Sequence, residues 1–483
     1  MTIARTDDLL ERLAPFARLD GARLVVSDAD AFRGDAIDDL VFDAVFAPDA
    51  DRRDASRWLI WAASQALGCP SASIHDLYMA RGRGQFNGLT VPAINVRASA
   101  YLTAQQAMRA AQERDAGAVI FEIAKSEMSY TDQRPAEYAA VILAAALKVG
   151  WQGPIFLQGD HFQFNATKWA ADPETELRGL ADLTREAIAA GFLNIDIDSS
   201  TLVDLARPSV AEQQALNAHN TAELTRLIRS LQPRDVTISI GGEIGEVGKS
   251  NSTEDELRTY LDGYHAELGE HGGPGISKVS IQTGTSHGGV PLPDGSVADV
   301  KIDFDTLARL SRVAREEYGL AGCVQHGAST LPDEAFHHFP AAGAAEIHLA
   351  TGFQNILYDE AGLPEHLRAE MMAWCRDNLA DERKDGETDQ QFLYKTRKKA
   401  LGPFKRQLWT LRPEAQEEIA GNLRARFGVL CDELGIAGSA ELVRRYVRPV
   451  PVEMPLPASL GGAARGRAVS AGASVFEDDG SGE

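Results

Sequence analysis

Residues 154–161 read Pro-Ile-Phe-Leu-Gln-Gly-Asp-His, and the rest of the chain is organised around this stretch. Its apolar part, residues 154–157, predicts a short buried strand. The strand runs out in a glycine and then in Asp160 and His161, and neighbouring side chains on a strand point to opposite sides. One of these two residues can therefore face a metal while the other faces a substrate.

The same pattern of strand followed by helix continues along the chain. Expected strands span residues 91–96, 118–123, 154–157, 194–197, 236–240, 278–282, 322–325 and 346–350. Expected helices span residues 102–114, 136–148, 174–190, 211–231, 253–268, 304–317 and 332–341. This alternation implies parallel strands with right-handed crossovers. Eight such strands over roughly 250 residues predict an α/β protein with a (β/α)8 TIM barrel.

Three further regions flank the barrel, which is expected over residues 76–360. Residues 1–75 combine helical patterns at 7–17 and 57–67 with a strand at 22–26, and they carry no chemical motif. We expect this N-terminal extension to serve packing or oligomerisation. Residues 361–450 are predicted to be helical. Residues 451–483 are rich in Ala, Gly, Ser and Pro, which predicts a disordered tail.

Composition limits the class of protein. The chain has 483 residues, 44% of them hydrophobic and 24% charged, which is typical of a globular protein. A net charge of -22 argues against nucleic acid or an anionic membrane as a partner. No apolar segment is long enough to span a membrane, and residues 1–11 lack a signal-peptide core. Four cysteines form no CxxC pair, so we expect reduced thiols in a cytoplasmic protein.

Polar residues gather where the expected strands end, which is where TIM barrels carry their catalytic groups. Three of them are histidines, His161, His287 and His326, and Glu243 adds a carboxylate. A single histidine is more often a buried hydrogen-bonding group than a ligand. Three at the ends of different strands favour a metal centre, and mixed N/O ligands suit zinc, with cobalt, iron or manganese as substitutes.

The last three strands end in runs of small residues, at 287–289, 326–329 and 350–352. Small residues let a ligand approach the backbone, and successive N–H groups can bind an anion. The loops after the last two strands of a TIM barrel are a frequent phosphate site. The alternative is that glycine only makes the turns, but the neighbouring metal ligands favour phosphate.

Seven segments, in order, resemble the class II, metal-dependent fructose-bisphosphate and tagatose-bisphosphate aldolases. They are residues 91–96 (VPAINV), 160–161 (DH), 191–200 (GFLNIDIDSS), 243–248 (EIGEVG), 284–288 (GTSHG), 326–329 (HGAS) and 350–351 (AT). No single motif is decisive, but seven in the right order are specific. The resemblance covers residues 75 to 360 approximately, with weaker similarity beyond.

The resemblance implies a role for each matching residue. His161, His287 and His326 resemble the zinc ligands, and Glu243 resembles a residue that binds zinc in one of its positions. Asp160 resembles the acid/base at the bond that breaks. The other matches resemble a supporting acid near the metal (Asp198), residues that bind the substrate or its phosphate (Asn95, Gly288, Gly327, Ser329, His348 and Thr351), and an arginine that reaches a neighbouring subunit's distal phosphate (Arg397).

The implied reaction is cleavage or formation of a C–C bond in a phosphorylated ketose such as fructose 1,6-bisphosphate. The products are dihydroxyacetone phosphate and an aldehyde, and the metal stabilises an enediolate. The family also implies a place in carbohydrate metabolism such as glycolysis, zinc or another divalent metal, a monovalent cation near the phosphate, and a homodimer or higher homo-oligomer. Two alternatives stay open, namely a non-catalytic or regulatory sugar-phosphate-binding barrel, and a metal hydrolase or epimerase.

Four departures from the family concern the residues around the substrate. His348 stands where the family usually has asparagine, and Ala124 stands where a serine helps to bind phosphate. After Glu243, Thr253 and Glu256 fit a helix capping box and leave little room for the family's mobile catalytic loop. The stretch after residue 289 lacks the usual basic residue. We therefore expect a metal aldolase whose substrate differs from that of typical members.

Overall fold

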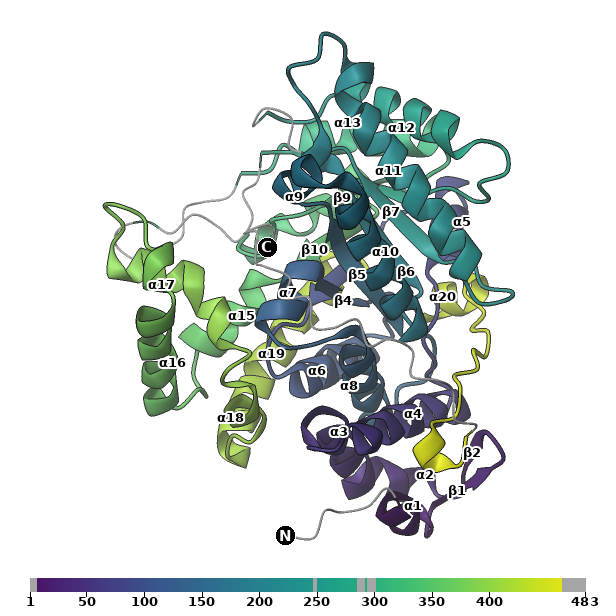
Figure 1. Cartoon of the computed structure of the whole chain (residues 1–483), viewed down its shortest axis with the longest axis vertical. Helices are drawn as coiled ribbons and strands as arrows, with labels where there is room; N and C mark the ends of the chain where they lie inside the picture. The colour runs from purple at the N-terminus through teal and green to yellow at the C-terminus, as the bar shows by residue number, and fades with distance from the viewer. Residues whose placement is uncertain (1–6, 246–249, 285–291, 293–300, 463–483) are drawn as a thin grey trace.

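The computed structural model describes residues 7–245, 250–284, 292 and 301–462. Its centre is a closed barrel of eight strands in the order β10-β3-β4-β5-β6-β7-β8-β9, all parallel. The predicted TIM barrel is confirmed, and Figure 1 shows its strands enclosed by helices. The strands are β3 (Val91–Asn95), β4 (Ile120–Ala124), β5 (Phe156–Gln163), β6 (Asn194–Asp198), β7 (Ser239–Glu243), β8 (Lys278–Ile281), β9 (Cys323–Gln325) and β10 (Glu346–Leu349).

Two strands extend further than the sequence predicts. β5 continues beyond residue 157 to Gln163, and β7 continues beyond residue 240 to Glu243. Both extensions contain glycine and polar residues, which have low β-propensity. Parallel pairing with the neighbouring strands satisfies their backbone groups and overrides that propensity. The site residues on β5 and β7 therefore lie within paired strands rather than in the loops that follow.

The barrel helices agree closely with prediction, with one exception. They are α6 (Ala100–Glu113), α8 (Pro135–Lys148), α10 (Pro173–Ala189), α11 (Val210–Leu231), α12 (Glu254–Leu268), α13 (Phe304–Glu316) and α15 (Thr351–Asp359). The expected capping box of Thr253 and Glu256 is present at the start of α12. The helix expected at 332–341 is instead a 3-10 turn, η3 (Asp333–Ala335), and a short α14 (His338–Ala342). Pro340 lacks the N–H that a continuous helix would require there, but it is tolerated in the first turn of α14.

The N-terminal extension packs against one side of the barrel. It contains α1 (Asp7–Leu13), a hairpin of β1 (Ala17–Asp20) and β2 (Arg23–Val26), α2 (Ala29–Ala31), a π-helical turn η1 (Phe32–Ala36), α3 (Ile37–Phe46), α4 (Ala50–Ala66) and α5 (His75–Gly82). Helices α3 and α4 contact α8 of the barrel. Apart from α5, which is drawn beside α11 and β7, these purple elements lie at the lower end of the molecule in Figure 1.

The C-terminal region adds helices on the outside of the barrel. They are α16 (Glu365–Asn378), α17 (Asp389–Thr396), α18 (Lys405–Trp409), α19 (Pro413–Glu433) and α20 (Ala440–Tyr446), and α19 packs along α6. Among the residues that the structure describes, no helix is both long and apolar enough to cross a membrane.

The start of the expected disordered tail is held against α4. The indole N–H groups of Trp58 and Trp61 donate hydrogen bonds to the carbonyls of Met454 and Val452, each over 3.2 Å. Val452 and Met454 therefore lie against α4, and the disorder expected over residues 451–483 stays a prediction. Residues 463–483 lie outside the described part of the chain.

Candidate active site and metal centre

An irregularity in β5 brings Asp160 and His161 to the same side of the strand. His161 has a φ of +40°, and the pairing register with β6 shifts between Gly159 and Phe162. Regular pleating would send the two side chains in opposite directions, but the shift breaks that alternation. A Cβ atom on Gly159 would lie 2.6 Å from the Phe162 ring, so only glycine fits. Asp160 Oδ1 consequently lies 3.9 Å from His161 Nε2.

Three of the predicted metal ligands converge in the mouth of the barrel. His161 on β5, Glu243 on β7 and His326 after β9 each present a ligand atom within 4.8 Å of the others. His161 Nε2 lies 3.0 Å from His326 Nδ1, and His161 Nδ1 lies 3.4 Å from Glu243 Oε2. Ser280 Oγ lies 2.9 Å from the other ring nitrogen of His326 and orients that ring.

This set of donors suits a divalent transition metal. Two atoms bound tetrahedrally to zinc at about 2.1 Å lie about 3.4 Å apart, which is close to the 3.0 Å between His161 Nε2 and His326 Nδ1. The Glu243 contact is made to His161 Nδ1, the ring nitrogen that would not bind the same ion. Two imidazoles and a carboxylate are the mixed N/O set that zinc accepts. The fourth predicted ligand, His287, and the predicted phosphate-binding Gly288 lie outside the described residues.

The two carboxyls beside His161 have pKa values shifted in opposite directions. Burial opposes ionisation of Asp198, but contacts with His161, Ser200 and Gln163 outweigh it and lower the pKa of that carboxyl. Asp198 Oδ2 lies 3.2 Å from His161 Nδ1, and this contact orients the imidazole ring. Burial, together with the Asp198 charge, raises the pKa of Glu243 to about 8. A cation bound between these side chains would favour the carboxylate form of Glu243.

Asp160 is held from two sides. Asn95 Nδ2 donates to its Oδ2 over 2.8 Å, and His348 Nδ1 lies 3.1 Å from its Oδ1. Burial opposes ionisation, but His161 and His348 outweigh it and keep the pKa of Asp160 well below its usual range. The site therefore presents Asp160 as a carboxylate, the form that can accept a proton.

A layer of buried polar side chains fills the barrel directly beneath the site. TIM-barrel interiors are usually filled with branched apolar residues. Here the layer contains Glu122 on β4, Gln158 on β5, Asp196 on β6, Lys278 on β8 and Glu346 on β10, all of them buried. Lys278 Nζ lies 2.9 Å from Asp196 Oδ2 and also pairs with Glu346. Gln158 Nε2 donates over 2.7 Å to both Glu122 and Glu346.

The three carboxyls of this layer have pKa values shifted in different directions. Burial raises the pKa of Glu122 well above its usual range, and the charge of Asp160 adds to the effect. Burial likewise raises the pKa of Asp196 to about 6. Lys278 outweighs burial at Glu346 and lowers that pKa to about 2. Glu346 is thus the carboxyl in the layer that stays fully ionised.

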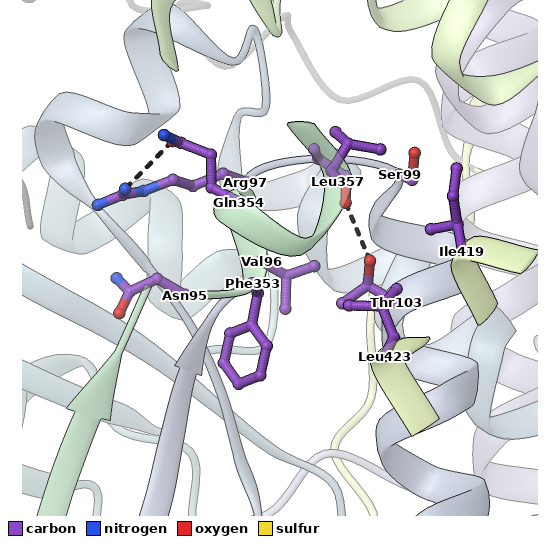
Figure 2. A pocket seen from close by; sticks show the side chains of 11 residues that line it. Asn95, Val96, Arg97, Ser99, Thr103, Phe353, Gln354, Leu357, Ile419 and Leu423 are labelled. Atoms are coloured by element: carbon purple, nitrogen blue, oxygen red, sulfur yellow. Dashed lines mark hydrogen bonds between the residues drawn. The ribbon is translucent and has the colours of Figure 1, made fainter. Parts of the chain in front are cut away.

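A second polar cluster lies at the rim between β3 and α15. Arg97 is buried, and its guanidinium pairs with Glu127 and lies 3.3 Å from Thr351 Oγ1. Glu127 also accepts a hydrogen bond from Asn95 over 2.9 Å. Figure 2 shows Arg97 following Asn95 along the chain and directing its guanidinium towards Gln354 of α15. Hydrogen bonds therefore connect Asp160, through Asn95, Glu127 and Arg97, to the expected phosphate site.

The structure brings most of the predicted site residues together. Asn95, Asp160, His161, Asp198, Glu243, His326 and His348 surround one region of the barrel mouth. Ser329 Oγ accepts the backbone N–H of Ala350 over 2.7 Å, which places it beside Thr351. Gly327 has a φ of +69° in the same loop.

Arg397 has partners inside its own chain. Its two terminal nitrogens donate to both carboxylate oxygens of Asp359, over 2.6 and 2.7 Å, and its guanidinium lies over the Tyr358 and Tyr394 rings. It is 7% exposed. These contacts anchor η5 (Arg397–Ala400) to α15, and the predicted contact to a distal phosphate stays a prediction.

Sequence reasoning missed the buried polar layer and Arg97. A signal for the layer was present, because β6 (NIDID) and β10 (EIHL) alternate polar with apolar residues. In a parallel strand covered by helices, the apolar set packs outward and the polar set must fill the barrel. No comparable signal marked Arg97, whose importance depends on long-range contacts with Glu127 and Thr351.

The fold and the site together define a TIM-barrel protein of the aldolase type with a potential metal centre. Residues 82–407 match the family described as "Fructose-bisphosphate aldolase class-II", which is more than half of the chain. The chain therefore belongs to the class II fructose-bisphosphate aldolase family. None of the curated proteins matches it.

Solved structures share the fold at low sequence identity. Fructuronate-tagaturonate epimerase UxaE from Cohnella laeviribosi is 12% identical, with a TM-score of 0.53 over 82% of this chain and 90% of that one. A probable tagatose 6 phosphate kinase from Sinorhizobium meliloti 1021 is 18% identical, with a TM-score of 0.51 over 74% and 99%. The fructose-bisphosphate aldolase of Campylobacter jejuni is 17% identical, with a TM-score of 0.44 over 77% and 96%. For the first two, whose TM-scores exceed 0.5, the likeness at these identities concerns the fold alone.

Proposed function

We propose that this protein is a metal-dependent aldolase that cleaves or forms a C–C bond in a phosphorylated ketose, giving dihydroxyacetone phosphate and an aldehyde. The observation that carries the proposal is the convergence of His161, Glu243 and His326 beside an ionised, doubly held Asp160. Membership of the class II family supports the same reaction.

His161, Glu243 and His326 would hold the metal, with His287 as the further ligand that the family resemblance implies. A divalent cation there supplies charge stabilisation for the oxygen of the substrate ketone. Asp198 keeps the His161 ring in place through their 3.2 Å contact. Zinc is the metal that this donor set suits best.

Asp160 supplies the proton transfer. Its carboxylate accepts the proton of the substrate hydroxyl as the C–C bond breaks, and it returns that proton in the condensation direction. Asn95 holds one of its oxygens. The Asn95 Oδ1 atom is buried without a hydrogen-bond partner among the described residues, so it is available to a substrate hydroxyl.

The substrate phosphate would bind at the carboxyl ends of β9 and β10. Gly327, Ser329 and Thr351 line this position, and Arg97 provides a positive charge next to Thr351. Arginine recognises phosphate through its planar set of donors. The excess of acidic residues on the whole chain does not oppose this, because local donors decide binding.

The test is a retro-aldol assay on purified, zinc-loaded protein with a panel of ketose phosphates and a triose-phosphate readout. We expect cleavage that chelation abolishes and zinc restores. Asp160→Asn should lower kcat on the order of 10²- to 10⁴-fold, the range for loss of a general base. It should leave the zinc content unchanged, because Asp160 is not one of the proposed ligands.

Three results would contradict the proposal. Cleavage that continues in the metal-free protein would exclude the metal mechanism. A zinc-loaded protein that binds the sugar phosphates without cleaving them would instead be the non-catalytic barrel. Conversion of a substrate into an isomer without release of two fragments would indicate an epimerase.

A further inference from the structure

His348 lies below the site, between the proposed catalytic carboxylate and the buried polar layer. It is fully buried on β10, with an exposed fraction of 0%. Its Nδ1 lies 3.1 Å from Asp160 Oδ1, and its Nε2 lies 2.6 Å from Glu346 Oε1. The ring thus connects two carboxylates and has no face open to a ligand.

Of the two carboxylates that His348 connects, Glu346 is held by more hydrogen bonds than Asp160. Glu346 accepts hydrogen bonds from Lys278, from Gln158 over 2.7 Å, and from the Tyr78 hydroxyl. All of these side chains are buried, and they come from three barrel strands and from α5. Glu346 therefore cannot shift without disturbing the barrel interior, and it sets the orientation of the His348 ring.

We propose that His348 is a positioning residue, which transmits the fixed orientation of Glu346 to the Asp160 carboxylate. This inference rests on the proposed aldolase function and differs from the contact with substrate that the sequence suggested. Asn95 holds Asp160 Oδ2, and His348 holds Oδ1. Two donors on different oxygens fix the rotation of the carboxylate plane, whereas either one alone would leave it free to turn.

A purely structural role is the competing explanation. His348 Nδ1 also lies 3.2 Å from Glu122 Oε1, and Nε2 lies 3.6 Å from Asp196 Oδ2. The ring could therefore serve only to neutralise a crowded acidic interior. Neutralisation depends on the charge of the whole ring, because both nitrogens face carboxyls of the interior. Positioning depends on Nδ1, because only that nitrogen faces Asp160.

Two amide variants separate the ring nitrogens. The asparagine amide reaches about as far as Nδ1, and the glutamine amide about as far as Nε2. His348→Asn therefore keeps a donor towards Asp160, and His348→Gln keeps a donor towards Glu346. The two variants are otherwise matched, since both are neutral and both carry one amide.

We expect His348→Gln to lower kcat for ketose-phosphate cleavage on the order of 10- to 100-fold, the effect of a misplaced catalytic group. KM and zinc content should stay unchanged. His348→Asn should keep kcat within a few-fold of wild type. The difference in kcat between the two variants should remain even if both lower Tm by the same amount. Equal kcat for the two, or a kcat loss that follows Tm, would overturn the proposal.

Crystal structures test the positioning role of His348 independently of the proposed aldolase activity. Crystal structures of the zinc-loaded wild type and of both variants should show the Asp160 carboxylate rotated only in His348→Gln. If wild type cleaves no ketose phosphate, the proposed function fails, while this comparison still decides whether His348 orients Asp160. An unchanged Asp160 in His348→Gln would reject the positioning role.

Discussion

We expect one buried residue outside the site, His75, to make the folded protein less stable in acid. His75 begins α5 and is buried, and its Nδ1 has no hydrogen-bond partner among the described residues. Burial, with smaller effects from Arg229 and Arg83, lowers the pKa of His75 from 6.5 to about 4. Between these two values the unfolded chain binds a proton that the folded chain does not bind, so falling pH favours unfolding.

We expect this effect to reach about 3 kcal/mol by pH 4, since one pKa unit corresponds to about 1.4 kcal/mol. In His75→Gln the loss of unfolding free energy between pH 7 and pH 4 should be smaller by up to that amount. Urea unfolding at several pH values measures it, and the exposed His366→Gln serves as the control. A variant with the same pH dependence as wild type would remove His75 as the cause.

At the scale of single residues, the sequence indicated which residues belong to the candidate site, but not which side chains they contact. The sequence identified four of these candidates because their residue types and their positions at the ends of expected strands can be read from it directly. They are Asp160, His161, Glu243 and His326. The partners of His348 were not identified, because they depend on which residues face each other across the barrel. Contacts such as His348 with Glu346, or Arg397 with Asp359, follow from side-chain orientation, which residue type does not specify.

Among the elements, β5 determines the geometry of the site. Its register shift with β6 lies between Gly159 and Phe162, and the positive φ of His161 falls within it. Gly159 leaves no room for a Cβ atom beside the buried Phe162 ring. Gly159→Ala would place a methyl group 2.6 Å from that ring. We expect it to lower the unfolding free energy by about 1–3 kcal/mol, as overpacking does, and to weaken zinc binding because His161 must move.

The matched control is Gly179→Ala in the exposed middle of α10, where an added Cβ meets nothing within 4 Å. Alanine is the better helix former, so this change should raise the unfolding free energy by about 0.5–1 kcal/mol. Urea unfolding and zinc titration of both variants test the pair. Unchanged zinc affinity in Gly159→Ala would show that the irregularity of β5 does not position His161.

The barrel strands were predictable in number and order but not at their ends. The strand–helix alternation identified all eight barrel strands, because buried β-branched runs and amphipathic helices have distinct periods. The ends of β5 and β7 were placed too early, since glycine and polar residues there resemble a loop. Only pairing with neighbouring strands makes those residues part of the sheet, and pairing is a property of the closed barrel.

At the scale of the whole molecule, the proposed metal centre joins parts of the barrel that are far apart in sequence. His161, Glu243 and His326 belong to β5, to β7 and to the loop after β9. The unfolded chain holds none of them close to another, so zinc should bind the folded state much more strongly. A ligand at a hundred times its Kd stabilises a folded protein by about 2.7 kcal/mol.

We therefore expect saturating zinc to raise the unfolding free energy of the metal-free protein by about 2–4 kcal/mol. His326→Ala should lose most of that gain, because one donor of the set is removed. Asp160→Asn should keep it, although we expect it to slow cleavage, because Asp160 is proposed to act on the substrate and is not a proposed ligand. Thermal and urea unfolding with and without zinc would measure all three proteins, and the result needs no knowledge of the substrate. Equal stabilisation of wild type and His326→Ala would place the bound ion elsewhere on the protein, and the proposed reaction would lose its metal.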